Sequence, residues 1–459
     1  MAFPSPASPS VRPRKSAALV IFLCFLAIVF DGYDLVIYGA IVPKLLAYEA
    51  WGLTPVQTGA IGSYALAGMF IGAILIGYLT DVVGRRKIMM VSIASFSLLM
   101  LLTAWAPTPE LFGLFRFLAG LGLGGVIPTA IALTVEFSKL NRRNFNNALM
   151  FSGYAVGGIL AALLSLAFLP ALGFQGMLAL GGIPLIAVVP LLFKFLPESP
   201  AYLAAKGERV RAEQLVADYG LEPLPPTPVK GSTPETGRFR TLLSGRLLGA
   251  MVLFCLAGIC GQTLVYGLNT WLPQLMVIAK YSLASSLTFL LTVNIGAVVG
   301  VLVSSRLADR FGPRPVTAIS FASSGVALVL MGTGIMPLPA MYLLVAVVGF
   351  GSVGAQILVN GFVATYFSGA TRATALGITL GIGRIGAVLA ISGGGILVAA
   401  SLGNFINFSV WAIAAAIGVV AVLSVPRLAA PAATSSTEST EGTGTTTAAT
   451  APSKDVFLH

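Results

Sequence analysis

Long apolar runs alternate with short polar segments along this chain. Runs of about membrane-spanning length lie near residues 17–42, 55–80, 88–106, 111–135, 146–169, 175–196, 247–272, 284–308, 315–335, 340–367, 373–399 and 404–426. A helix needs about 20 apolar residues to cross the hydrocarbon layer of a membrane, so each run predicts one crossing. The pattern therefore predicts an all-α membrane protein with twelve transmembrane helices.

One polar interruption is much longer than the others and separates the runs into two sets of six. It covers residues 197–246 and predicts a cytoplasmic linker whose first part, 199–219, forms a short amphipathic helix. We therefore expect an N-terminal six-helix bundle at 17–196 and a C-terminal six-helix bundle at 247–427. The end segments 1–16 and 428–459 are rich in Pro, Ser, Ala and Thr without apolar periodicity, which predicts disordered cytoplasmic tails.

Charge supports this class of protein and predicts its orientation. Only 9% of the residues are charged and 57% are hydrophobic, whereas a soluble domain has about 25% charged residues. Of the 27 Lys and Arg residues, Lys44 and Lys280 lie on one side of the predicted membrane, Arg116 and Arg384 lie within helices, and the rest lie on the other side. The positive-inside rule places both termini in the cytoplasm. The net charge of +11 therefore reflects topology, and we expect no nucleic-acid partner.

A short charged phrase occurs in both halves. Gly77-Tyr-Leu-Thr-Asp81-Val-Val-Gly84-Arg85-Arg86-Lys87 joins the second and third runs, and Ser305-Arg306-Leu-Ala-Asp309-Arg310-Phe-Gly312-Pro-Arg314 joins the eighth and ninth. A repeat of this kind predicts two pseudo-symmetric bundles of a transporter. We expect a cavity between them, lined by the first, fourth, fifth, seventh, eighth, tenth and eleventh helices.

Charged residues at the ends of helices predict gates at the cytoplasmic mouth of this cavity. A carboxylate there can accept hydrogen bonds from helix N-termini and from arginine, and so close the mouth in one state. The alternative is that these loops only carry charge for topology, but an acidic residue at the same place in both copies favours gates. The candidates are Asp81, Arg85, Arg86, Glu136, Arg143, Asp309 and Arg310.

Four charged residues lie inside the predicted spans and away from their cytoplasmic ends, where an ionisable side chain usually marks a functional site. Asp31 and Asp34 lie three residues apart on one face of the first helix. Burial and mutual repulsion favour a proton on at least one of them, with Arg116 as the local counter-charge. Arg384 lies near the bilayer centre and needs an anion, either a carboxylate of the first helix or the substrate. Permanent ion pairs are the structural alternative.

Polar and aromatic residues in other spans suit a flat aromatic ligand with one or two hydrogen-bonding groups. Any single one of them is more often part of the packed core. The substrate-binding candidates, besides Arg384, are Tyr33, Tyr266, Asn269, Asn294, Gln356 and Asn360.

Metal, cofactor and enzyme chemistry are disfavoured by the sequence. Cys24, Cys255 and Cys260 lie in apolar runs without metal-ligand spacing, and His459 is the single histidine. The phrase Gly381-x-Gly383-x-x-Gly386 lies in a predicted membrane helix and has no preceding strand, so it is not a nucleotide site. We expect no cofactor, no metal and no enzymatic activity.

The chain resembles the major facilitator superfamily over about residues 17–426. The loop phrases given above match the family's loop signature. Glu136 with Arg143 resembles the charge pair that ends its fourth helix, and Leu196-Pro-Glu198-Ser-Pro200 resembles the end of its sixth.

Three further motifs resemble the aromatic acid:proton symporter family. They are Asp31-Gly-Tyr-Asp34, Arg116-Phe-Leu-x-Gly-Leu-Gly-Leu-Gly and Gly381-x-Gly383-Arg384-x-Gly386-Ala. Val82 departs from the loop signature, where arginine is usual. Some members have a histidine in the second half and this chain has none there, so proton coupling cannot depend on it.

The resemblance implies proton-coupled import of an aromatic carboxylate of the benzoate, hydroxybenzoate or chlorophenoxyacetate type by alternating access. It implies a bacterial inner membrane, the lipid bilayer and protons as partners, and a monomer. The membrane potential also favours proton coupling. Moving a monoanion into a cell against a potential of 100 mV, inside negative, costs about 2.3 kcal/mol, and a proton that enters with it removes this cost. The alternative is a transporter of sugars, drugs or other organic anions. A receptor or channel is disfavoured by the doubled loop.

Overall fold

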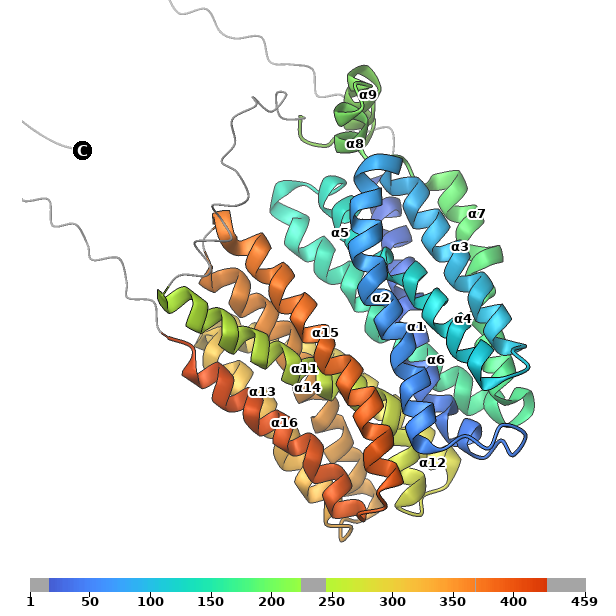
Figure 1. Cartoon of the computed structure of the whole chain (residues 1–459). Helices are drawn as coiled ribbons and strands as arrows, with labels where there is room; N and C mark the ends of the chain where they lie inside the picture. Colours follow the sequence, from blue (N-terminus) through green and yellow to red (C-terminus); the bar gives the residue numbers. More distant parts are fainter. Residues whose placement is uncertain (1–15, 224–244, 368, 427–459) are drawn as a thin grey trace, which may run out of the picture. The chain divides into compact units, whose positions relative to one another are not determined.

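The computed structural model describes residues 16–223, 245–367 and 369–426, and this part of the chain is helical without strands. Figure 1 shows the helices as two groups. The N-terminal group contains α1 (Ala17–Leu46), α2 (Pro55–Val83), α3 (Arg85–Ala104), α4 (Pro109–Gly124), α5 (Val126–Glu136), the 3₁₀ turn η1 (Leu140–Arg142), α6 (Arg143–Leu180) and α7 (Ile183–Phe195). The helix α4 continues almost directly into α5, so the two make one crossing.

The C-terminal group repeats the same order of long helices. It contains α11 (Gly245–Ile278), α12 (Leu283–Phe311), α13 (Pro313–Gly332), α14 (Leu338–Tyr366), α15 (Gly369–Ala399) and α16 (Asn404–Ser424). Local sequence sets several of the starts. Thr54 and Gln57 form a capping box ahead of α2, and the Ser282 hydroxyl accepts the Ser285 N–H at 3.1 Å ahead of α12.

The number of crossings agrees with the twelve predicted. Eleven stretches among the described residues are long and apolar enough to cross a membrane, and one of them, Phe145–Phe195, has 51 residues. A straight helix of that length would extend ~76 Å, against ~30 Å of hydrocarbon. The chain turns inside it at Gly173, where φ is 62°. This stretch therefore crosses twice, as the fifth and sixth spans.

The two groups are six-helix bundles with the same internal pairing. In the first, α1 packs on α6 and α2 on α4; in the second, α11 packs on α15 and α12 on α14. Glycines permit the closest approaches at equivalent places. A Cβ on Gly120 of α4 would collide with the Ala65 carbonyl of α2, and one on Gly349 of α14 would collide with the Val293 carbonyl of α12. The doubled loop signature therefore reflects a doubled architecture.

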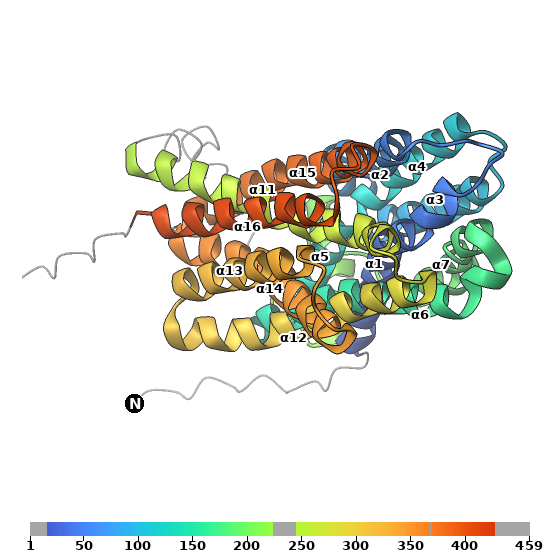
Figure 2. The same cartoon turned by 90° about the horizontal axis from the view of Figure 1, so that it is seen from below.

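The two ends of the bundles differ in how the halves meet. We call the helix ends next to Gly84 and Gly312 the basic end, and those next to Leu46 and Ala399 the far end. Figure 2 shows α15 beside α2. Ser392 donates a hydrogen bond of 2.9 Å to the Ser63 hydroxyl, close to the far end. In this conformation the two bundles are joined at the far end.

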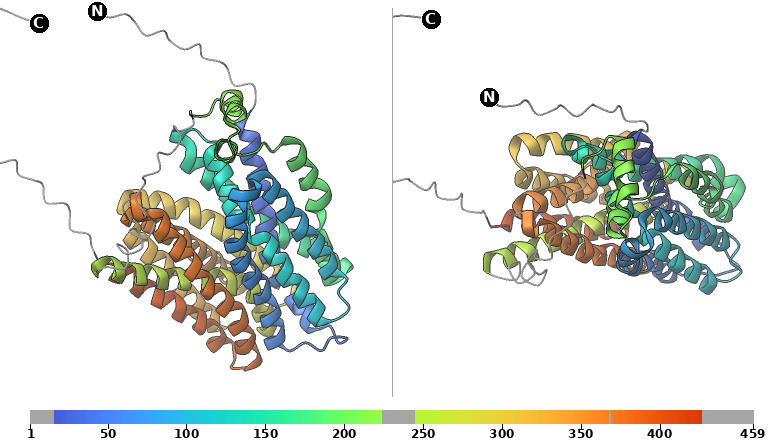
Figure 3. Two further views of the ribbon diagram at one scale, coloured as in Figure 1. Left: turned by 45° about the horizontal axis from the view of Figure 1, so that its top comes forward. Right: turned by 90° about the horizontal axis from the view of Figure 1, so that it is seen from above.

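Two short helices, α8 (Pro200–Ala205) and α9 (Arg209–Tyr219), follow α7 at the basic end (Figure 3). The sequence predicts one amphipathic helix over 199–219, and the structure has two. The break falls at Gly207, whose φ of 86° does not belong to a right-handed helix. Most of the predicted tails and the rest of the linker, residues 1–15, 224–244 and 427–459, lie outside the described residues.

Candidate functional site

Four polar side chains, two from each bundle, form what we call the central layer: Asp31 of α1, Tyr154 of α6, Tyr266 of α11 and Arg384 of α15. The Tyr154 hydroxyl donates a hydrogen bond of 3.1 Å to that of Tyr266. Asp31, which is only 2% exposed, interacts electrostatically with Arg384. Opposite charges therefore face each other across the boundary between the bundles. The Asp31 carboxylate, one of the two anions expected for Arg384, thus lies within electrostatic reach of it, and the described residues show no direct ion pair between the two.

Both members of this charge pair keep hydrogen-bonding capacity. Asp31 Oδ2 and Arg384 Nη1 are buried, and within the described part of the chain neither has a hydrogen-bond partner. Buried polar atoms are usually satisfied, so unpaired ones at a central charge pair indicate a place where a ligand binds. A carboxylate ligand would complement Arg384, and a proton would complement Asp31.

Asp34 and Arg116 form a separate ion pair inside the N-terminal bundle. They are 4% and 2% exposed, respectively. The same guanidinium lies 5.1 Å from the centre of the Tyr38 ring and 3.6 Å from the Met100 sulfur. Since Arg116 pairs with Asp34, it is not the direct partner of Asp31. Because all four residues belong to one bundle, this pair can persist while the bundles move.

A small cavity of about 20 Å³ lies on the far-end side of the central layer. Its wall includes Asp31, Asp34, Arg116, Tyr154 and Thr270, together with residues of α2 and α15. The helices that line this cavity agree only in part with the expected ones, because α2 contributes to the wall and α12 and α14 do not. An aromatic acid does not fit this volume, which is close to that of one or two water molecules.

Several predicted substrate ligands are engaged elsewhere in the structure. Tyr33 is buried and donates a hydrogen bond of 2.6 Å to the Met177 carbonyl within its own bundle. Asn294 donates to the side-chain oxygen of Asn269 at 3.0 Å, which links α12 to α11. Both amides also donate to a carbonyl of their own helix. The structure does not place these three side chains in the wall of the cavity.

Gln356 and Asn360, both on α14, lie one helical turn apart. The Gln356 amide donates to Asn360 at 3.5 Å. Gln356 Oε1 packs against Gly261 of α11 and has no hydrogen-bond partner among the described residues. The Gln356 side-chain oxygen can therefore accept a hydrogen bond from a ligand, whereas that of Asn269 already accepts one from Asn294.

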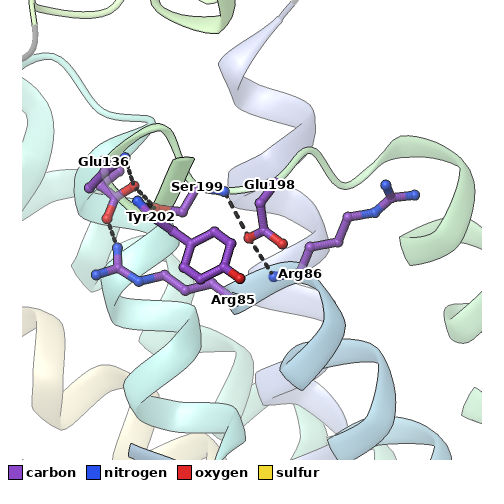
Figure 4. A network of polar contacts seen from close by, with 7 residues as sticks. Arg85, Arg86, Glu136, Glu198, Ser199 and Tyr202 are labelled. Atoms are coloured by element: carbon purple, nitrogen blue, oxygen red, sulfur yellow. Dashed lines mark hydrogen bonds and ion pairs between the residues drawn. The ribbon is translucent and has the colours of Figure 1, made fainter. Parts of the chain in front are cut away.

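Two of the gate candidates, Arg85 and Glu136, contact each other at the basic end of the N-terminal bundle (Figure 4). Arg85, at the start of α3, forms an ion pair with Glu136, at the end of α5. Glu136 also accepts hydrogen bonds from the Ser199 hydroxyl and, at 3.5 Å, from the Ala201 N–H. Glu136 therefore connects the loop signature with the start of α8.

A second carboxylate, Glu198, completes this network. It accepts the backbone N–H groups of Arg86 at 3.0 Å and of Ser199 at 2.9 Å. The Tyr202 hydroxyl donates to the Val82 carbonyl at 3.2 Å. We call these contacts between the loop after α2, α5 and α8 the basic-end clamp.

Glu198, Ser199 and Tyr202 were not among the candidates from sequence. The signal that could have found them is Ser199 followed by Pro200. A hydroxyl residue before proline marks a helix start, and here it lies directly after an acidic residue.

The remaining gate candidates are placed differently. Arg143 forms an ion pair of 3.6 Å with Glu222, just beyond α9. Asp309 and Arg310 are exposed, with the Arg310 guanidinium over the Phe311 ring. The side chain of Asp81 lies outside the described part. The structure thus shows the first copy of the loop bound to α5 and α8, and these two residues of the second copy at the surface.

Two six-helix bundles with equivalent pairings, a doubled charged loop and a charge pair between the bundles define a membrane transporter. The family model for the Major Facilitator Superfamily matches residues 24–304 and 284–458, and the chain belongs to this family.

Within the family, the chain is similar to transporters of aromatic acids. It is 37% identical to the benzoate transport protein of Acinetobacter baylyi, with 86% of each chain covered. It is also 37% identical to the gentisate transporter of Corynebacterium glutamicum, with 88% of this chain and 86% of the relative covered.

Among solved structures, one similar to this chain is a partially occluded, inward-open conformation of the xylose transporter of E. coli. The TM-score is 0.71 at 19% identity, and 89% of this chain and 96% of that chain are covered. At this identity the likeness concerns the fold and not the substrate.

Proposed function

We propose that this protein imports an aromatic carboxylate together with protons across a bacterial inner membrane, with both termini in the cytoplasm. The basic end is then cytoplasmic and the far end extracellular, as the distribution of Lys and Arg favours. The relatives named for benzoate and gentisate support the class of substrate. The observation that carries the proposal is that Asp31 and Arg384, from different bundles, lie within electrostatic reach and each keep a buried atom without a hydrogen-bond partner among the described residues.

Coupling follows from competition for Arg384. While Asp31 is ionised, it neutralises the guanidinium across the boundary. A proton on Asp31 removes this partner, and Arg384 then needs another anion, since an uncompensated buried charge is costly. The substrate carboxylate supplies it through two parallel hydrogen bonds. Proton and substrate therefore bind together, and each favours the binding of the other.

Movement of the two bundles would let substrate and proton bind from one side of the membrane and leave on the other. Contacts at the far end, such as Ser63 with Ser392, close the proposed extracellular side in the present conformation. Release to the cytoplasm would let Asp31 lose its proton and pair again with Arg384. The Asp34–Arg116 pair takes no part in this competition, and we assign it a structural role. A neutral sugar would leave Arg384 without an anion, which disfavours sugar transport.

The test uses purified protein in proteoliposomes with an imposed pH gradient. Radiolabelled benzoate, gentisate and 4-hydroxybenzoate are compared with xylose, with and without a protonophore. We expect accumulation of at least one aromatic acid, abolished by the protonophore, and none of xylose. Accumulation that is unaffected by the protonophore would contradict proton coupling, and uptake of none of the acids would contradict the substrate class.

A further inference from the structure

Thr270 of α11 has a buried hydroxyl that its own helix does not satisfy. A buried threonine in a helix can donate to the carbonyl four residues earlier. Thr103 does so to Leu99 at 2.6 Å, and Thr129 to Gly125 at 2.7 Å. Thr270 is only 1% exposed, yet its Oγ1 has no partner among the described residues. The hydroxyl is therefore free to form a hydrogen bond with a bound molecule that is not part of the protein.

The group that fits is water. Thr270 lines the cavity of about 20 Å³, together with Asp31 and Arg116. Asp31 Oδ2 and Arg116 Nε are also buried and, like Thr270 Oγ1, lack a hydrogen-bond partner in the described part of the chain. A cavity above about 15 Å³ with two to four polar neighbours holds one water molecule. One acceptor, one donor and one hydroxyl match the hydrogen-bonding pattern of water.

The cavity lies on the path that a proton from the far end would take to Asp31. Asp34 lies about 4.5 Å beyond Asp31 along α1, and Thr270 about 6 Å beyond Tyr266 along α11, both toward the far end. The cavity thus separates the central layer from the far-end contacts of Ser63 with Ser392.

We propose that this cavity is a water site through which protons from the extracellular side reach Asp31, with Thr270 as a positioning residue. The proposal rests on the proposed function. When the far-end contacts separate, a proton arriving from outside protonates the water. One O–H bond of the resulting hydronium then breaks while an O–H bond to the Asp31 carboxylate forms, and neutral water remains. Asp34 does not take this proton because Arg116 occupies its carboxylate.

Asp31 faces charged and titratable groups from four helices, and these groups surround it when it takes up the proton. They are Asp34 of α1, Tyr154 of α6, Tyr266 of α11 and Arg384 of α15. Thr270 lies on the C-terminal bundle, whereas Asp31 and Arg116 lie on the N-terminal one. The water site therefore lies at the boundary between the two bundles.

The experiment compares net uptake driven by a pH gradient with exchange at equal pH, which needs no net proton movement. Radiolabelled benzoate, or whichever of the three acids the wild type transports, is the probe. Thr270→Val keeps the shape of the side chain and removes the hydroxyl, and Thr270→Ser keeps the hydroxyl. Thr103→Val is the matched control, since Thr103 is equally buried and bonds its own helix.

We expect Thr270→Val to lose net uptake by about tenfold, as removal of one partner of a buried hydrogen bond predicts. Exchange should fall much less, and Thr270→Ser should restore net uptake. The inference is overturned if Thr270→Val matches the control, if net uptake and exchange fall together, or if the serine variant is as poor as the valine variant. A wild type that exchanges substrate but ignores the pH gradient would instead overturn the proposed coupling.

Discussion

At the scale of single residues, the two aspartates of α1 have different surroundings although they share one helix face. Asp34 is paired with Arg116 inside one bundle, whereas Asp31 interacts with Arg384 of the other bundle. Sequence alone treats them alike, because both lie in an apolar run. Under the proposed function, these different partners predict a structural role for Asp34 and a coupling role for Asp31.

This difference predicts that the same substitution mainly lowers stability at Asp34 and mainly removes proton coupling at Asp31. Asp34→Asn leaves the Arg116 guanidinium buried without a counter-charge, which costs about 3–5 kcal/mol of stability. Asp31→Asn should lower the unfolding temperature in detergent less, because Arg384 is only partly buried whereas Arg116 is buried. It should retain substrate exchange, while pH-driven accumulation is lost. Adding Arg116→Gln to Asp34→Asn should recover stability. Equal unfolding temperatures of the two single variants would refute the assignment.

Arg384 should determine affinity for the substrate. Arg384→Ala removes the partner of a desolvated carboxylate, so binding should weaken by about 2–5 kcal/mol. Arg384→Lys should recover little, because lysine lacks the planar fork that binds a carboxylate through two hydrogen bonds. Arg372, exposed on the same helix, offers the control Arg372→Ala. The measurement is half-saturation in counterflow with benzoate. Unchanged affinity in Arg384→Ala would exclude substrate contact.

At the scale of elements, the basic-end clamp makes the two copies of the loop unequal. Gly84 and Gly312 have φ of 110° and 87°, respectively, so each needs glycine for its backbone. Only Gly84 also lies against other residues: a Cβ there would meet the Glu198 carboxylate and, at 3.1 Å, the Tyr202 ring. Around Gly312 there is open space. The first loop is thus held by α8, and the second is not held in this way.

Matched glycine substitutions test the clamp. Gly84→Ala and Gly312→Ala share the strain of a positive φ, about 1–2 kcal/mol. Gly84→Ala also pushes Glu198 away from the backbone N–H of Arg86, so it should lower the unfolding temperature further and slow uptake more. Thermal unfolding and initial uptake rates are measured for both. If Gly312→Ala were the more damaging, the clamp would not be what the first loop depends on.

At the scale of the whole molecule, the sequence predicts the architecture well and the contacts less well. Apolar run lengths and the doubled loop depend on local residues, and the twelve crossings and two bundles follow from them. The contacts of Glu198 with Arg86 and of Tyr154 with Tyr266 join different helices, so no local pattern indicates them. The Asn269–Asn294 pair shows the opposite case. Both amides look like ligands in sequence, yet Asn294 donates to Asn269 once α11 and α12 pack together.

The alternating-access cycle gives a final prediction for Ser63 and Ser392. Their hydroxyls are 2.9 Å apart between α2 and α15, which is close enough for a disulfide between cysteines at these positions. Oxidation of the double variant Ser63→Cys/Ser392→Cys should hold the far end closed and stop uptake. Reduction should restore it, because the bundles can then separate again.

The two single cysteine variants control for oxidation itself, since the native Cys24, Cys255 and Cys260 are buried. A shift in electrophoretic mobility after cleavage in the 224–244 segment reports cross-linking, because the disulfide then joins the two halves. Uptake of benzoate is measured on the same sample. A fully cross-linked protein that still transports at the rate of the single variants would show that the far end need not open. Transport would then not proceed by separation of α2 from α15.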